Sequence, residues 1–143
     1  MRDESVKVTC TLVDHPLVKT ALAYRFDAAD RSIVISGDTT RSANLVRLAA
    51  GADVLVHEAL YPAAVDRLVA RVPNATALRK HLLASHTTAE DCGRVAAEAG
   101  VRTLVLSRLV APDDPLVTER MWIDAARSHF KGRIVVGRDL MEI

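Results

Sequence analysis

The sequence predicts an α/β domain built around a mixed sheet, and three observations support this fold class. Short apolar runs such as Ile33-Val34-Ile35 and Val54-Leu55-Val56 have the length of buried strands. After about residue 40, apolar strand-like runs alternate with amphipathic helical segments, as in α/β proteins. The chain has 143 residues, half of them hydrophobic and 26% charged, which fits one domain over residues 1–143 with its own core.

The first part of the chain is expected to form three strands. Val6–Val13 alternates in hydropathy and is rich in β-branched residues, and Asp14-His15-Pro16 ends it. Ala21–Phe26 is the second strand, and Asp27–Arg31 makes the turn to a third strand at Ser32–Ser36. The second and third strands are therefore expected to form a hairpin.

The rest of the chain is expected to alternate between helices and strands. A short helix at 42–50 turns Leu45 and Ala49, with Val46 and Leu48, inward and ends before Gly51. A capping box, with Thr87 as N-cap and Glu90 three residues on, starts a helix that ends before Gly100. The other expected elements are strands at 53–56, 101–106 and 134–136 and helices at 62–72, 74–83 (capped by Asn74) and 116–130.

Composition and charge exclude several classes of function. Nineteen basic residues against eighteen acidic ones give a net charge of +1, so charge does not indicate a nucleic-acid partner, although Arg67, Arg71, Arg79 and Lys80 cluster locally. No apolar run approaches the ~18 residues of a membrane span, and no signal-peptide pattern is seen. Cys10 and Cys92 are isolated, which is typical of reduced thiols in a cytoplasmic protein.

Residues able to carry chemistry fall at the expected strand ends and loops. Asp38 follows the third strand, His57 and Glu58 end the fourth, and His15 follows the first. Carboxylates and imidazoles bind zinc, and open α/β sheets build sites at strand ends. His86 precedes an expected helix N-terminus, whose dipole favours a neutral ring that can act as acid or base, and Glu58 is placed to orient or relay protons to His57. The remaining histidines, at 81 and 129, lie in helical patterns without an acidic or histidine partner and are expected at the surface or at helix ends.

The order of the sequence blocks resembles that of the metallo-β-lactamase-fold hydrolases, most closely their ribonuclease Z and arylsulfatase-like branch. The resemblance covers nearly the whole chain, and the set of blocks in order is more specific than any block alone. The blocks are His15-Pro16, Ala21–Phe26, Ser36-Gly37-Asp38-Thr39, His57-Glu58-Ala59-Leu60, Ser85-His86-Thr87-Thr88 and Leu106-Ser107-Arg108-Leu109.

This resemblance implies a fold, a cofactor and residue roles. Family members form an αββα sandwich that holds two metal ions, usually zinc, and this chain looks like its C-terminal half, a mixed sheet with helices on one side. Asp38 matches the carboxylate that bridges both metals, and His15 matches a ligand of the first metal. Glu58 and His86 match the acid/base pair of the ribonuclease Z branch.

Two departures from the family pattern bear on activity. The family's first signature, His-x-His-x-Asp-His, does not occur in this sequence. Arg108 stands where the family places its last metal-binding histidine, and a guanidinium has no lone pair to give to a metal. Only His15 and Asp38 of the ligand set remain, so we expect weak or absent metal binding and little or no hydrolase activity from this chain alone.

Three functions remain open at this point. The leading one is a truncated or degenerate metal-dependent hydrolase for phosphodiesters or other esters; the others are a non-catalytic anion-binding or regulatory domain that uses Arg108, and one piece of a split hydrolase completed by an N-terminal partner. Arg108 is expected to form a salt bridge with Asp38, with anion binding as the alternative. Half a sandwich exposes an apolar sheet face, so the sequence also predicts a homodimer through that face.

Overall fold

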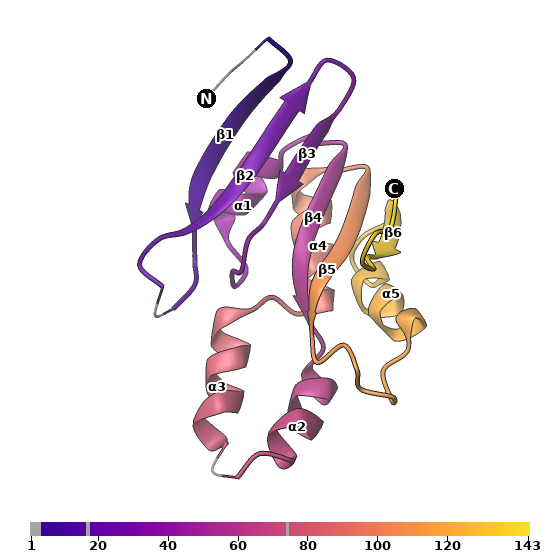
Figure 1. The fold of residues 1–143 in the computed structure, drawn as a ribbon. Helices are drawn as coiled ribbons and strands as arrows, with labels where there is room; N and C mark the ends of the chain where they lie inside the picture. The colour runs from indigo at the N-terminus through magenta and orange to yellow at the C-terminus, as the bar shows by residue number, and fades with distance from the viewer. Residues whose placement is uncertain (1–3, 17, 74) are drawn as a thin grey trace.

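The computed structural model describes residues 4–16, 18–73 and 75–143 and has one six-stranded sheet, as the α/β prediction requires (Figure 1). The strands lie in the order β1-β2-β3-β4-β5-β6. The elements are β1 Val6–Val13, β2 Ala21–Ala28, β3 Ser32–Ile35, α1 Ala43–Ala49, β4 Val54–Leu60, α2 Pro62–Ala70, α3 Thr76–Ser85, α4 Ala89–Ala99, β5 Thr103–Val110, α5 Glu119–Arg127 and β6 Arg133–Val136.

The sheet is mixed, with an antiparallel and a parallel part. β1, β2 and β3 are antiparallel neighbours, and the pairing of Tyr24 with Ile35 confirms the predicted β2–β3 hairpin. From β3 to β6 each strand is parallel to the next. The carboxyl ends of the parallel strands therefore share one edge, where loops bring chemistry-bearing residues together.

Helices cover one face of the sheet. α1 packs on β1 and β2, α4 on β4 and β5, and α5 on α4 and β6, which matches the expected one-sided arrangement (Figure 1). Alternate strand residues such as Val34, Leu55 and Leu104 are fully buried under these helices. α2 and α3 pack on each other beyond the sheet edge, below β4 and β5 in Figure 1.

β4 and β5 extend well past the ends that the sequence suggests. β4 continues past Val56 to Leu60, and β5 continues past Leu106 to Val110, with the two strands paired throughout. His57, Glu58 and Arg108 therefore lie within strands, so the prediction that His57 and Glu58 end a strand is wrong. The polar residues His57 and Glu58 suggest that the strand ends there. It continues because the hydrogen-bond partners of the buried Glu58 side chain come from segments distant in sequence.

Several helix ends also differ from the expectation. The N-cap of α4 is Thr88, whose hydroxyl accepts a hydrogen bond from the Asp91 N–H at 3.1 Å, so Thr87 is not the cap. α5 begins at Glu119 because Leu116 belongs to a turn closed by the Asp114 side chain. The N-cap of α3 is Ala75, and the cap expected at Asn74 falls outside the described residues. None of the described helices has the length and apolar character needed to span a bilayer.

Candidate functional site

Asp38 lies in the loop that follows β3, at the shared edge of the parallel strands. The loop is held close to β2 by Gly37, whose φ is +63° and where a Cβ atom would lie 2.6 Å from the Leu22 carbonyl oxygen. Only glycine fits this backbone without strain. The loop therefore places the Asp38 carboxylate, 25% exposed, over the ends of the neighbouring strands.

Arg108 reaches Asp38 from a bulge in β5. Glu58 pairs with Ser107 and Ala59 with Leu109, so Arg108 is the extra residue, and its φ of 44° is left-handed. Such bulges redirect side chains near functional sites. The guanidinium binds both carboxylate oxygens, with Nε 2.5 Å from Oδ1 and Nη2 2.7 Å from Oδ2. The salt bridge that the sequence predicts is present, as a two-point contact.

Glu58 is the buried centre of a hydrogen-bond network. Its side chain is 3% exposed, and Oε1 accepts hydrogen bonds from the Thr87 N–H at 2.9 Å and the Thr39 N–H at 3.4 Å. The Thr87 hydroxyl donates to the Thr39 carbonyl at 2.6 Å, and the Glu58 N–H donates to the Ser36 hydroxyl. These contacts join the Asp38 loop, β4 and the segment before α4 into one unit.

His86 contacts the other oxygen of the Glu58 carboxylate. His86 Nδ1 lies 3.3 Å from Glu58 Oε2, and the His86 side chain is 11% exposed. Hydrogen bonding to Glu58 raises the pKa of His86, and burial opposes that shift. The expectation that a helix dipole keeps this ring neutral is wrong, because His86 caps the C-terminal end of α3 and contacts the Glu58 carboxylate. Glu58 does not reach the His57 side chain in the way expected, since His57 Nδ1 bonds to the Glu58 backbone carbonyl.

His15 lies beside both His86 and His81. The His15 ring is centred 5.7 Å from the His86 ring and 6.4 Å from the His81 ring, edge-on in both cases. His81 Nδ1 lies 3.4 Å from the Ser85 hydroxyl, one helical turn along α3. The sequence predicts His81 only as a histidine at the surface or at a helix end. Its spacing of four residues from Ser85 places the two on one helix face, but this spacing alone is weak evidence for a contact.

The structure thus groups the predicted site residues in two contacting sets. Asp38 pairs with Arg108, and Glu58 contacts His86, which stacks edge-on with His15. Asp38 and Arg108 also influence the pKa of His86 through their charges, in opposite directions. Thr39 and Thr87 belong to motif blocks that the sequence shows, but sequence reasoning gave neither a part in the site, which their hydrogen bonds organise. The roles assigned to all five predicted residues remain predictions.

The described residues do not fit a two-zinc centre by themselves. Within residues 4–16, 18–73 and 75–143, no group of three or more His, Cys, Asp or Glu side chains is arranged to hold a metal ion. Both oxygens of Asp38 are taken by a guanidinium, which supplies positive charge where a metal would. His15 and Asp38 are thus too few donors for a hydrolytic site.

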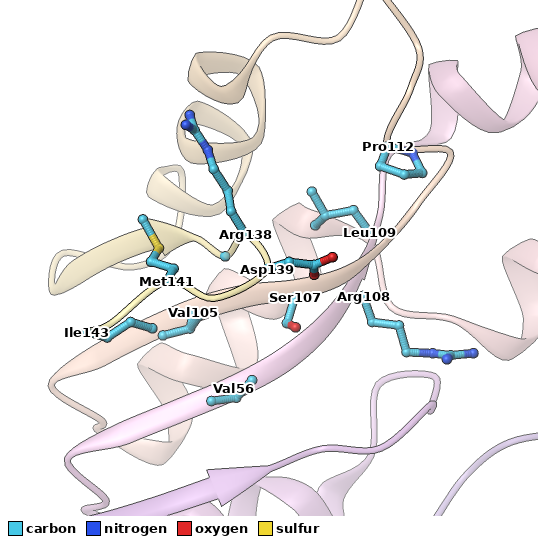
Figure 2. A pocket seen from close by; sticks show the side chains of 11 residues that line it. Val56, Val105, Ser107, Arg108, Leu109, Pro112, Arg138, Asp139, Met141 and Ile143 are labelled. Carbon is cyan, nitrogen blue, oxygen red and sulfur yellow. The ribbon is translucent and has the colours of Figure 1, made fainter.

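A pocket of about 530 Å³ lies beside Arg108, between β5 and the C-terminal segment (Figure 2). Its walls are largely apolar, and Ser107, Arg108 and Asp139 contribute polar groups. Arg138 points away from the pocket in Figure 2 and pairs with Glu119. The apolar wall is formed by Val56, Val105, Leu109, Pro112, Met141 and Ile143.

Curated proteins similar to this chain are ribonucleases Z from mycobacteria. The chain is 31% identical over 140 residues to "Ribonuclease Z" of Mycobacterium tuberculosis (strain ATCC 25618 / H37Rv), which covers 98% of this chain and 49% of that protein. It is 33% identical over 140 residues to "Ribonuclease Z" of Mycobacterium sp. (strain KMS), covering 98% and 47%. The chain spans about half the length of these relatives. No protein-family model matches it.

Solved structures similar to the chain share one fold. The metallo-β-lactamase fold protein YhfI from Bacillus subtilis superposes with a TM-score of 0.71 at 20% identity, covering 96% of this chain and 49% of that one. The short form of human tRNase Z gives a TM-score of 0.62 at 19% identity, covering 99% and 42%. Sequence and structure comparisons agree on the fold, and in each case about half of the larger protein is matched.

Proposed function

This chain has the metallo-β-lactamase fold and resembles the ribonuclease Z branch of its metal-dependent hydrolases, and from that premise we propose that it carries part of a phosphodiester-hydrolysing centre which it cannot complete alone. The proposal includes the roles that the family resemblance implies: Asp38 and His15 as metal ligands, and Glu58 with His86 as the proton-handling pair. A cytoplasmic location and zinc as the metal belong to the same proposal.

The observation that carries this proposal is the two-point contact between Arg108 and Asp38. Both oxygens of the Asp38 carboxylate bind the Arg108 guanidinium, so the carboxylate is not free to bind a metal cation. A metal could bind only after breaking this charge-assisted bidentate pair. Hydrolysis by a metal-bound nucleophile needs three or more protein ligands, and the described part of the chain does not assemble them.

Glu58 and His86 support the hydrolase ancestry more than a purely structural role. Glu58 is nearly fully buried, and its Oε2 faces His86 while backbone N–H groups hold Oε1. A carboxylate fixed in this way raises the pKa of the histidine, so His86 stays protonated to higher pH than a free imidazole. A protonated His86 can then donate to the leaving oxygen of a phosphodiester.

Metal content tests the incomplete centre. We expect the purified chain, dialysed after exposure to zinc, to hold far less than one zinc per chain by elemental analysis. Arg108→His should raise zinc uptake because it frees Asp38 and adds an imidazole, and Arg108→His combined with His15→Ala should lose that gain. The matched control is Arg102→His, which places a histidine at another exposed arginine that pairs with Asp53. Stoichiometric zinc on the unaltered chain would contradict the proposal.

Complementation tests where the missing ligands come from. The half of the mycobacterial ribonuclease Z that this chain does not match is added in trans, and hydrolysis of bis(p-nitrophenyl) phosphate is followed with zinc present. We expect no turnover by the chain alone and measurable turnover for the Arg108→His chain with the added half, abolished by Asp38→Asn. Zinc-dependent turnover by the unaltered chain alone, lost in Asp38→Asn, would rule the proposal out.

A second candidate function is anion binding at Arg108. The Arg108 side chain is 70% exposed and lines the 530 Å³ pocket, so its guanidinium edge is open to a ligand. Titration with inorganic phosphate, followed by heteronuclear NMR, distinguishes this candidate. Saturable shifts around Arg108 that vanish in Arg108→Gln favour an anion-binding domain, and shifts that persist in that variant speak against it.

A further inference from the structure

We propose that the helix-free face of the sheet is an interface through which two copies of this chain pair. The strand register places one set of side chains on this face, opposite the residues buried under the helices. The set is almost entirely apolar or small, and it consists of Val8, Cys10, Leu12, Leu22, Tyr24, Phe26, Ile33, Ile35, Val54, Val56, Thr103 and Val135. Val105 shares this side of the sheet but is 2% exposed and is not counted in the set. We call this set the open face.

Exposure on the open face is unusual for a monomer. Leu12 is 56% exposed, Ile35 44% and Tyr24 40%, and Tyr24 stacks with Phe26 at a ring-centroid distance of 6.4 Å. These residues come from three adjacent strands, so their exposed surfaces are contiguous. Large contiguous apolar patches on soluble proteins mark interaction sites.

The exposed area of the chain matches what an interface requires. The accessible surface is 8399 Å², whereas a monomer of 15.5 kDa is expected to expose about 7,200 Å². The difference exceeds the ~800 Å² that each partner buries in a standard interface. A second copy of the chain brings an identical six-stranded sheet, which is the same size as the face to be covered.

A second copy suits the open face because the face is nearly free of formal charge. Along the described strands, the charged neighbours in the same registers are Arg133 at the sheet edge and the buried Glu58. Two identical neutral faces meet without like-charge repulsion in a closed two-fold pair. Aligned sheet-on-sheet packing, as in β-sandwiches, is the geometry we expect.

Mass in solution tests the interface. Light scattering of the unaltered chain should give twice the mass of 15.5 kDa, and Ile35→Arg should give a monomer with unchanged far-ultraviolet circular dichroism. The matched control is Leu116→Arg, which places the same charge at an exposed apolar residue outside the sheet. A monodisperse monomer for the unaltered chain, or a dimer that persists in a folded Ile35→Arg variant, would overturn the proposal.

Thiol labelling of the unaltered chain gives a second test of the interface, and this test does not depend on whether a variant folds. Cys10 is exposed and lies on the open face, whereas Cys92 is buried in the core. Maleimide labelling of Cys10 should slow at high protein concentration and accelerate on dilution, while Cys92 stays unlabelled in both. Labelling of Cys10 at a rate independent of concentration would count against pairing. If the added half of the mycobacterial relative protects Cys10 and a second copy does not, the face belongs to that partner and self-pairing is wrong.

Discussion

At the scale of single residues, Arg108 sets the charge that faces Asp38. A histidine at position 108 would offer a lone pair, while Arg108 offers a fixed positive charge on a bulge that aims it at Asp38. The rest of the site, including the buried Glu58 and its backbone donors, is intact around this pair. The Arg108 guanidinium therefore balances the charge of the Asp38 carboxylate.

His57 is predicted to make the protein less stable in mild acid. Burial lowers the pKa of His57 below 6.5, so the unfolded chain takes up a proton at pH values where the folded chain does not. The destabilisation caused by the buried His57 is absent well above pH 6.5 and grows as the pH falls below 6.5. Its limiting size is about 1.4 kcal/mol of unfolding free energy for each unit by which the pKa is lowered. His57→Asn keeps a donor for the Glu58 carbonyl and removes the titration. Urea unfolding near pH 6.5 and about pH 5 should show a smaller loss of stability in this variant than in the unaltered protein.

His86 is predicted to act in the opposite direction and in a different window. Its pKa is raised above 6.5 by Glu58, so its stabilising contribution is fully present below pH 6.5 and is lost as pH rises through the raised pKa. His86→Gln should therefore flatten the decline in unfolding free energy between pH 6.5 and about 8.5 without altering the acid limb. The half-buried His129, which pairs with Glu90 far from Glu58, provides a histidine variant for comparison, His129→Gln. Equal pH profiles for His86→Gln and the unaltered protein would contradict the Glu58–His86 contact.

The grouping of the candidate site residues at one edge of the sheet could be predicted from sequence, but their environments could not. Asp38, Glu58 and His86 stand out because of their position after apolar runs. The partners that set the behaviour of Glu58 are the backbone N–H groups of Thr39 and Thr87, separated from it by 19 and 29 residues. Any residue type can donate through its backbone N–H, so the sequence does not reveal which groups hold Glu58 in place. The raised pKa of His86, which depends on Glu58, could therefore not be predicted.

At the scale of elements, the loop after β3 depends on a glycine. Gly37→Ala should destabilise the protein by about 2–3 kcal/mol, since it combines a left-handed backbone with a Cβ atom only 2.6 Å from the Leu22 carbonyl oxygen. Gly51→Ala is the matched control: its φ is +65° but nothing lies within 4 Å of the added atom, so about 1 kcal/mol is expected. Chemical denaturation measures both. Equal losses in the two variants would show that the close approach of the Gly37 loop to β2 does not matter.

Element type could be predicted from pattern, whereas element ends depended on contacts from afar. The β2–β3 hairpin and the end of α4 at Gly100 follow from local residues, and both are present. The N-cap of α4 does not follow from local residues, because Thr87 and Thr88 are adjacent threonines and each has an acidic residue three positions later. The Thr87 N–H is taken by Glu58 and its hydroxyl by Thr39, which leaves Thr88 to cap the helix.

At the scale of the whole molecule, the two faces of the sheet differ in how they are covered. The helices bury one side of the sheet, and the side chains on the other side are as apolar as a core. Matched proteins are about twice as long, so in them more chain is available to meet such a surface. The sheet thus has one face covered by helices and one apolar face that a second polypeptide can cover, which is what the pairing proposed above requires.

Pairing through the open face makes stability depend on protein concentration. Because folded dimer and unfolded monomers are linked by mass action, a tenfold increase in concentration should stabilise the dimer by about 1.4 kcal/mol and raise its melting temperature. Ile35→Arg should remove this dependence, while Leu116→Arg, on a residue 64% exposed outside the sheet, should keep it. Differential scanning calorimetry over a hundredfold range of concentration is the measurement. A melting temperature that stays constant for the unaltered chain would mean that the open face folds and remains unpaired, and that its apolar side chains are tolerated in water.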